Sequence, residues 1–431
     1  ILISVYFNGS SLDDVESQLI TYFIADNPSN KGGQVAYDQD DIINGNGGNN
    51  VNDYSDREKV ALEVVLPFWE KVLFPEKWVS TPTLNELRTS ALVKYSPIKQ
   101  LTDQQVELIK EVLDNGKTNY VINGDAGTGK TVLLTHLVAQ FLNSEKDKSI
   151  AVVVQPNWIK TATEIFKVYG LNSSNLKILS STQLINLKQK FDTIIVDESH
   201  KLSRRGSKQM ASFNTVYNNP EFTTCETHLE PLIRLSNQLI LMYDVLQAIR
   251  PANIAREKFR ELTSDFEQRY LTTQFRIQAP KNKSYSSEDY INGIKYLLYK
   301  DTELLDYTNF DPNFNRSLFT ENNSDAYFGF FEESPLKNLI DWIEEDNNYN
   351  PEHINRVLSG LVEPWRQADG KDSSITHFHE GDLSRRWNST QDDWINSPDD
   401  DAEKQIGSVF AVQGIDLNKV GVLIGNDLLV D

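Results

Sequence analysis

The sequence contains almost no cysteine and no long apolar run. Cys225 is the only cysteine among 431 residues, which excludes a disulfide framework and a zinc ribbon within this chain and suits a reducing cytoplasm. No segment reaches the roughly 18 consecutive apolar residues of a membrane helix, so we expect no membrane partner. The first residues also lack the features of a signal peptide. We therefore expect a cytoplasmic protein.

Basic residues are scarce compared with acidic ones. The chain has 42 Lys and Arg against 62 Asp and Glu, which gives a net charge of −20. Neutralising nucleic-acid phosphates requires basic residues, so this composition argues against a generally basic nucleic-acid coat. It still allows a motor that lines one groove with basic residues and keeps an acidic outer surface.

The texture of the sequence changes along the chain and predicts three regions. Residues 1–95 combine helical patterns with an Asn/Gly/Asp-rich loop and predict a small N-terminal α+β module. Residues 96–250 alternate short apolar runs with amphipathic segments, which is typical of βαβ units and a parallel sheet. The predicted strands of this region are TNYVING, SIAVVVQP, DTIIVDES and QLILMYD. Residues 251–431 are mixed and return to predicted strands at 407–412 and 419–425, as in a second α/β lobe.

Both ends of the sequence indicate a piece of a longer protein. The chain begins with Ile rather than Met, and its last residue follows directly on a predicted strand, with no helix to cover it. We therefore expect the second lobe to be truncated at its C-terminus.

A glycine-rich segment, GDAGTGKT, lies between a predicted strand and a predicted helix and matches G-x-x-x-x-G-K-[ST]. Gly124, Gly127 and Gly129 would let backbone N–H groups surround a β-phosphate at the positive end of the helix dipole. Lys130 would reach the β- and γ-phosphates, and Thr131 would give its hydroxyl to Mg²⁺. The segment predicts a site for ATP and Mg²⁺.

A second segment, IIVDE, is an apolar strand that ends in two carboxylates. Asp197 would hold Mg²⁺ through water, and Glu198 would polarise the attacking water. Alone, such a pair is more often a surface pair; together with the glycine-rich loop, the functional interpretation is favoured. The two segments predict a P-loop NTPase, with a RecA-like parallel sheet as its core and a second, partial RecA-like lobe.

These motifs, in this order, resemble those of superfamily 1 helicases. More closely, the sequence is similar to the bacterial DUF2075 family, whose ATPase domain is related to the helicase-like part of Schlafen proteins. The similarity runs through KYSPIKQLTDQQ, DESHKL, YDVLQAIRP and TQFR. It implies that Gln105 reads the adenine edge, that Gln247 senses the γ-phosphate, and that Arg276 is an arginine finger.

A further segment, VQGIDLN, resembles motif V of the superfamily. The resemblance implies that Gln413 and Gly414 link the ATP state to strand contact, and that Asp416 stands where many relatives have a Glu that meets the ribose. The sequence departs from the family at Phe410 and Ala411, where His-Thr is usual. The family's final T-R-[GA] segment, with a second arginine finger, is also absent from this sequence.

Residues 1–60 resemble the second half of the GIY-YIG nuclease found in some DUF2075 proteins. That resemblance implies a metal-binding role for Glu16 and a supporting role for Asn44 or Asn46. The alternative is an exposed helix glutamate followed by a plain turn.

Aromatic and basic residues alternate in one part of the second lobe. Trp365, Arg385, Arg386 and Trp387 are the residue types that hold single strands by base stacking and charge pairing. The alternative is that the tryptophans belong to the core.

Two hypotheses of function remain open on the sequence alone. The first is an ATP-dependent, helicase-like motor on DNA or RNA, with DNA the more expected partner; the family resemblance adds a nuclease and phage defence. The second is an ATP-binding switch or interaction module that does not translocate.

Overall fold

The chain forms two compact units, Ile1–Leu318 and Phe319–Asp431. The computed structural model describes residues 3–26, 56–84, 101–144, 147–169, 173–206, 214–247, 252–273, 283–319, 329–350, 353–360, 374–389, 404–412 and 417–425, together with single positions between these ranges. Within the part of the chain so described, no helix is both long enough and apolar enough to cross a bilayer.

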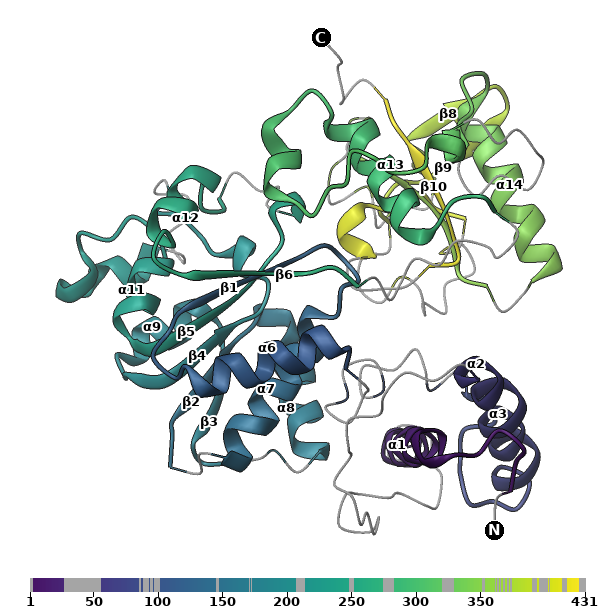
Figure 1. Ribbon diagram of the computed structural model, residues 1–431. Helices are drawn as coiled ribbons and strands as arrows, with labels where there is room; N and C mark the ends of the chain where they lie inside the picture. The colour runs from purple at the N-terminus through teal and green to yellow at the C-terminus, as the bar shows by residue number, and fades with distance from the viewer. Residues whose placement is uncertain are drawn as a thin grey trace. The chain divides into compact units, whose positions relative to one another are not determined.

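A six-stranded parallel sheet forms the centre of the first unit (Figure 1). Its strand order is β3-β2-β4-β5-β1-β6, and every neighbouring pair is parallel. The strands are β1 (Tyr120–Gly124), β2 (Ile150–Val153), β3 (Leu176–Leu179), β4 (Phe191–Val196), β5 (Ser236–Tyr243) and β6 (Glu267–Leu271). The predicted fold class, a parallel α/β sheet of the P-loop NTPase type, is confirmed.

Alternate residues of the central strands enter two separate hydrophobic cores, because successive side chains of a strand point to opposite faces. In β4, Ile194 and Val196 belong to one core and Ile195 to the other. In β1, Val121 and Ile122 divide in the same way. A sheet that is buried on both faces needs such continuous apolar strands, which is why these strands are readable in the sequence.

Helices cover both faces of this sheet. One face packs against α6 (Asp103–Asp114), α7 (Lys130–Ser144) and α8 (Ile159–Val168), and the other against α9 (Ser181–Leu187), α11 (Leu229–Arg234) and α12 (Arg256–Leu262). Another helix, α13 (Ser287–Tyr299), follows β6 in the chain. Short 3₁₀ helices are η4 (Pro156–Trp158), η5 (Ser199–Lys201), η7 (Thr215–Asn218), η8 (Pro220–Phe222), η9 (Val245–Gln247), η10 (Glu303–Tyr307) and η11 (Arg316–Phe319).

The described residues of the N-terminal region form a helical module within the first unit. Its elements are α1 (Gly9–Ala25), α2 (Arg57–Val60), η2 (Ala61–Val65), α3 (Leu66–Phe68) and η3 (Trp69–Leu73), of which η2 and η3 are π-helical turns. Trp69 is fully buried, and its Nε1 donates to the Thr81 carbonyl at 3.0 Å. The module therefore has a hydrophobic core of its own.

The boundary predicted at residues 250/251 falls within the first unit. The physical reason is β6, which pairs in parallel with β1 and so extends the sheet across that boundary. Both β3 and β6, the two strands of this sheet that the sequence did not predict, are edge strands. Edge strands bury less apolar surface, so their sequences carry a weaker hydrophobic pattern.

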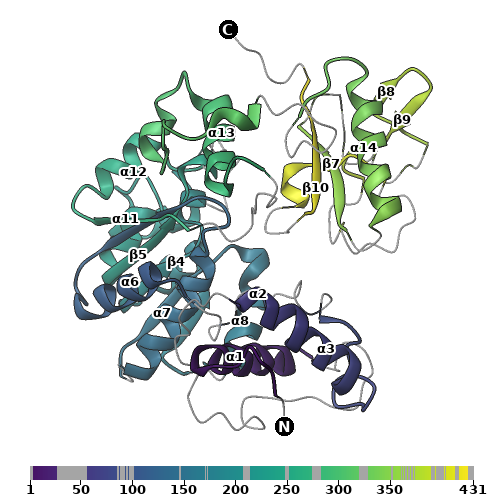
Figure 2. The same cartoon turned by 45° about the vertical axis from the view of Figure 1, so that its right-hand side comes forward.

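The second unit is a smaller α/β assembly. Strands β7 (Asn355–Ser359) and β10 (Lys419–Leu423) form a parallel pair against which α14 (Pro335–Tyr349) packs (Figure 2). Strands β8 (Phe378–Glu380) and β9 (Leu383–Arg385) form an antiparallel hairpin. The prediction of a strand at 419–425 is confirmed by β10.

The prediction of a strand at 407–412 is wrong. Within this segment, Gly407 bonds to β7: its N–H donates to the Val357 carbonyl, and its own carbonyl accepts from the Ser359 N–H. It then closes into a 3₁₀ helix, η14 (Val409–Ala411), through a 3.0 Å bond from the Ala411 N–H to the Ser408 carbonyl. An apolar run this short does not distinguish a strand from a buried turn.

Asp346 at the end of α14 predicts a pH dependence for the stability of the second unit. Burial opposes its ionisation, but hydrogen bonds from His353 at 2.7 Å, Asn355 at 2.7 Å and Lys419 lower its pKa to about 2. An aspartate in an unfolded chain has a pKa of about 3.9. The stabilisation is therefore present above about pH 4 and is lost as the pH falls towards 2.

Asp346→Asn should lower the free energy of unfolding by about 1–2 kcal/mol at pH 7, and by progressively less below about pH 4. Urea unfolding at pH 7 and pH 3, followed by tryptophan fluorescence, measures the difference. Asp341→Asn is the matched control, because Asp341 on the same helix makes only an exposed ion pair with Lys337. An equal loss at both pH values would contradict an electrostatic contribution.

Candidate functional site

Glycines shape the loop between β1 and α7. Gly127 has a φ of 86° and Gly129 a φ of 81°, a backbone region that L side chains rarely adopt. At the end of β1, a Cβ on Gly124 would overlap the hydroxyl of Thr128. That hydroxyl donates to the Asp125 carbonyl at 2.9 Å and so closes the turn. The loop therefore has the tight backbone that the sequence motif predicts.

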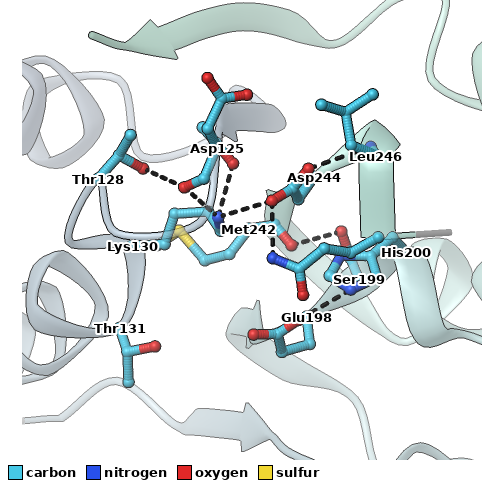
Figure 3. A network of polar contacts seen from close by, with 12 residues as sticks. Asp125, Thr128, Lys130, Thr131, Glu198, Ser199, His200, Met242, Asp244 and Leu246 are labelled. Atoms are coloured by element: carbon cyan, nitrogen blue, oxygen red, sulfur yellow. Dashed lines mark hydrogen bonds and ion pairs between the residues drawn. The ribbon is translucent and has the colours of Figure 1, made fainter. Parts of the chain in front are cut away.

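The ammonium of Lys130 lies inside this loop (Figure 3). It donates to the carbonyls of Gly124 at 2.6 Å and Asp125 at 3.0 Å, and a carboxylate oxygen of Asp244 lies 3.5 Å away. Its side chain is 7% exposed. Lys130 is also the first residue of α7, so its positive charge lies at the positive end of the helix dipole. An anion is favoured there.

A hydroxyl and a carboxylate meet at the next position of the site. Thr131 Oγ1 donates to Asp197 Oδ2 at 3.4 Å, although 65 residues, which include the three strands β2, β3 and β4, separate them in the chain. Asp197 comes directly after β4, and its N–H donates to the carbonyl of Val153 in β2 at 2.9 Å. Hard cations such as Mg²⁺ prefer oxygen ligands of this kind, so the two residues fit a magnesium site.

The surroundings of the Asp197 carboxyl disfavour its ionised form. Burial, and next the neighbouring Glu198 carboxylate, raise its pKa to about 7 against the opposing charge of Lys130. Its Oδ1 accepts a hydrogen bond from the Glu198 N–H at 3.1 Å. A divalent cation beside Thr131 would supply the positive charge that favours the ionised form.

Glu198 has the opposite electrostatic character. Burial opposes its ionisation, but His200 Nε2 at 2.8 Å, Lys201 at 3.5 Å and the charge of Lys130 hold its pKa at about 2. The His200 contact is close, although it is not aligned as a hydrogen bond. The backbone of Glu198 has a φ of 51° and a ψ of 46°, which is unfavourable for a residue with a side chain. In this conformation the Glu198 carboxylate lies against His200 and Lys201.

Asp244 connects the loop to the segment that follows β5. Its Oδ2 accepts from Gln247 Nε2 at 2.8 Å and lies 3.5 Å from Lys130 Nζ. Sequence reasoning assigned a role to Gln247 but none to Asp244. The available signal was position, because ligands of open parallel sheets bind at the carboxyl ends of the strands and Asp244 directly follows β5.

Gln105 lies beside the glycine-rich loop, as its predicted role in adenine binding requires. Its Oε1 accepts from the Thr102 N–H at 3.1 Å in a capping box, and its Nε2 donates to the Thr128 carbonyl at 3.4 Å. The side chain is 2% exposed. In this conformation the amide holds α6 against the loop; reading an adenine stays a prediction.

The remaining predicted site residues do not lie at the glycine-rich loop, or they fall outside the described part of the chain. Trp387 is buried in the core of the second unit, and its Nε1 donates to the Ser359 carbonyl at 3.2 Å, so its ring is not available for stacking on a base in this conformation. Arg385 contacts Glu344 at 3.5 Å, and Arg386 donates to the Asp372 carbonyl at 3.3 Å. The residues that lie outside the described part of the chain are Arg276, Trp365, Gln413, Gly414 and Asp416.

The nuclease prediction for the N-terminal module gains no metal site from the structure. Glu16 is half-buried on α1, and Asn44 and Asn46 lie outside the described residues. Over the described ranges, no group of three or more His, Cys, Asp or Glu residues could hold a metal ion.

The parallel sheet, the glycine-rich loop and the acidic end of β4 define a P-loop NTPase domain. Residues 117–431 match the family described as Schlafen group 3, DNA/RNA helicase domain, and the chain belongs to this family. The relationship to the helicase-like part of Schlafen proteins, which the motifs predicted, is thereby confirmed.

Similar proteins include an uncharacterized protein of Saccharomyces cerevisiae, YPL245W. It is 28% identical over 407 residues, which cover 83% of this chain and 80% of the yeast protein. Among solved structures, the Bacteroides Pif1 helicase in complex with ADP-AlF3 and ssDNA is 17% identical, with a TM-score of 0.24 over 57% of this chain and 58% of that one. The Pyrococcus furiosus Hef helicase domain is 12% identical, with a TM-score of 0.27 over 57% and 53%. This chain spans less than two thirds of either solved chain.

Proposed function

We propose that this protein is an ATP-dependent, helicase-like motor that hydrolyses ATP at the loop between β1 and α7 and acts on DNA or RNA. The observation that carries the proposal is the 3.4 Å contact between Thr131 and Asp197 beside the buried Lys130. A hydroxyl, a carboxylate and an ammonium of this kind are what a triphosphate with Mg²⁺ needs. Membership of a DNA/RNA helicase domain family supports the nucleic-acid partner.

Each described residue has a definite task in this proposal. Lys130 would exchange the carbonyls of Gly124 and Asp125 for phosphate oxygens, and Glu198 would orient and polarise the attacking water. Mg²⁺, when bound, would neutralise charge that develops on the phosphates. Gln247 donates to Asp244, which lies beside Lys130. A movement of Lys130 when phosphates bind or leave would therefore change the contacts of Asp244 and Gln247 in the segment after β5. The roles of Arg276 and Gln413 remain proposals from the family resemblance.

The test is the rate of ATP hydrolysis with Mg²⁺, measured with and without single-stranded DNA and single-stranded RNA. A motor should hydrolyse ATP much faster when its nucleic acid is present, because its two sites are coupled. We expect stronger stimulation by DNA than by RNA. Poly-glutamate of equal charge serves as the control for a polyanion effect.

A switch without translocation is the second function considered, and the net charge of −20 favours it. In that case ATP would bind and change the conformation, while the rate of hydrolysis would be indifferent to either nucleic acid. An absence of binding to any nucleoside triphosphate would contradict both functions.

Nuclease activity and phage defence rest on the resemblance alone. The corresponding experiment compares plasmid cleavage by the full-length protein and its Glu16→Ala variant in the presence of Mg²⁺. Equal cleavage, or none, would remove the nuclease from the proposal and leave the ATPase untouched.

A further inference from the structure

A second buried lysine reaches the glycine-rich loop from another part of the chain. Lys295 on α13 is 4% exposed, and its ammonium forms an ion pair with the carboxylate of Asp125, the second residue of the loop. The same ammonium donates to the Asn309 carbonyl at 2.8 Å. None of the motifs in the sequence includes Lys295.

The carboxylate of Asp125 is an unfavourable group in a loop that receives a polyphosphate. The backbone carbonyl of Asp125 accepts a hydrogen bond from the Lys130 ammonium at 3.0 Å. The acidic side chain is therefore carried by a residue that directly contacts the ammonium proposed to bind phosphate. Like charges at such separations repel strongly, because part of the surroundings is protein rather than water. The Asp125 side chain is 22% exposed, so water screens it only in part.

We infer that Lys295 is a positioning residue for the nucleotide site: it neutralises Asp125 and draws that carboxylate towards α13, so that the loop can accept a triphosphate. This inference rests on the proposed ATPase function. It adds a residue beyond the helicase motifs and makes α13 part of the nucleotide-binding apparatus.

Contacts other than the Lys295 ion pair also hold α13 in place, so Lys295 is not needed for that purpose alone. Ser286 and Asp289 form a capping box at its start, and Asp289 also accepts from the Asn315 N–H at 2.7 Å. Gly293 packs so closely on Leu318 that a Cβ would overlap it. A buried ion pair adds little net stability compared with apolar packing, which makes an electrostatic role towards the site the better account of this pair.

The experiment measures kcat and KM for MgATP, together with the melting temperature, in the full-length protein. Lys295→Met should raise KM by roughly tenfold or more, because it leaves the Asp125 charge beside the phosphates, and should change kcat much less. The double variant Lys295→Met, Asp125→Asn should restore KM to within about threefold of the wild type, since it removes the charge as well. Lys300→Met is the matched control, because Lys300 at the end of the same helix is half-exposed.

A charge effect and a packing effect give different results. If the double variant is as impaired as Lys295→Met, or if the loss lies in kcat alone, the inference is overturned. Should Lys295→Met fail to fold, Asp125→Asn decides the question: with Lys295 unpaired it should lower KM, and an unchanged or higher KM contradicts the inference. A wild type without ATP binding would instead refute the proposed function itself.

Discussion

Lys130→Ala should reduce ATP hydrolysis by about 10²- to 10³-fold, the usual loss when one preorganised donor to developing charge is removed. The ammonium is buried within the loop and pairs with Asp244, so its removal takes away the donor that this position would offer to the phosphates. Initial rates of phosphate release at saturating MgATP, with single-stranded nucleic acid present, measure the loss.

Lys190→Ala is the matched control for this experiment, because Lys190 is an exposed lysine just before β4. The melting temperature of both variants should be compared with that of the wild type, since Lys130 also holds the loop carbonyls. If Lys130→Ala retained most of the activity while remaining folded, hydrolysis would have to occur at another site.

Glu198→Gln should lower kcat by about 10²- to 10⁴-fold and leave the affinity for ATP nearly unchanged. His200, Lys201 and Lys130 hold the pKa of this carboxyl below its usual range, which favours the ionised form at neutral pH, whereas an amide of the same shape cannot accept a proton from water. The variant should therefore bind MgATP and accumulate as the ATP complex. Single-turnover hydrolysis and equilibrium binding of a fluorescent ATP analogue separate the two effects.

Glu257→Gln provides the comparison for Glu198→Gln, since Glu257 is an exposed glutamate on α12. A loss of binding rather than turnover in Glu198→Gln would mean that Glu198 supports the nucleotide or the loop instead of the attacking water. The strained backbone at Glu198 also predicts that Glu198→Gly would be tolerated by the fold better than by catalysis.

The sequence alone determined the fold class and predicted the residues of the candidate site. Strands that are buried on both faces need continuous apolar runs, so β1, β2, β4 and β5 were readable, and a P-loop needs glycines at fixed positions before Lys130. Those features are local, because each depends on residues that are close together in the chain.

The tertiary structure decided what depends on contacts between distant segments. It placed Asp244 beside Lys130 and brought Lys295 to Asp125 across 170 residues. It also decided between the two interpretations of Trp387, a surface for bases or a core residue, in favour of the core. It also extended the sheet through β6, an edge strand with a weak apolar pattern. Periodicity shows which residues are apolar, but only packing decides which charges and rings meet, since those pairings have no fixed spacing along the chain.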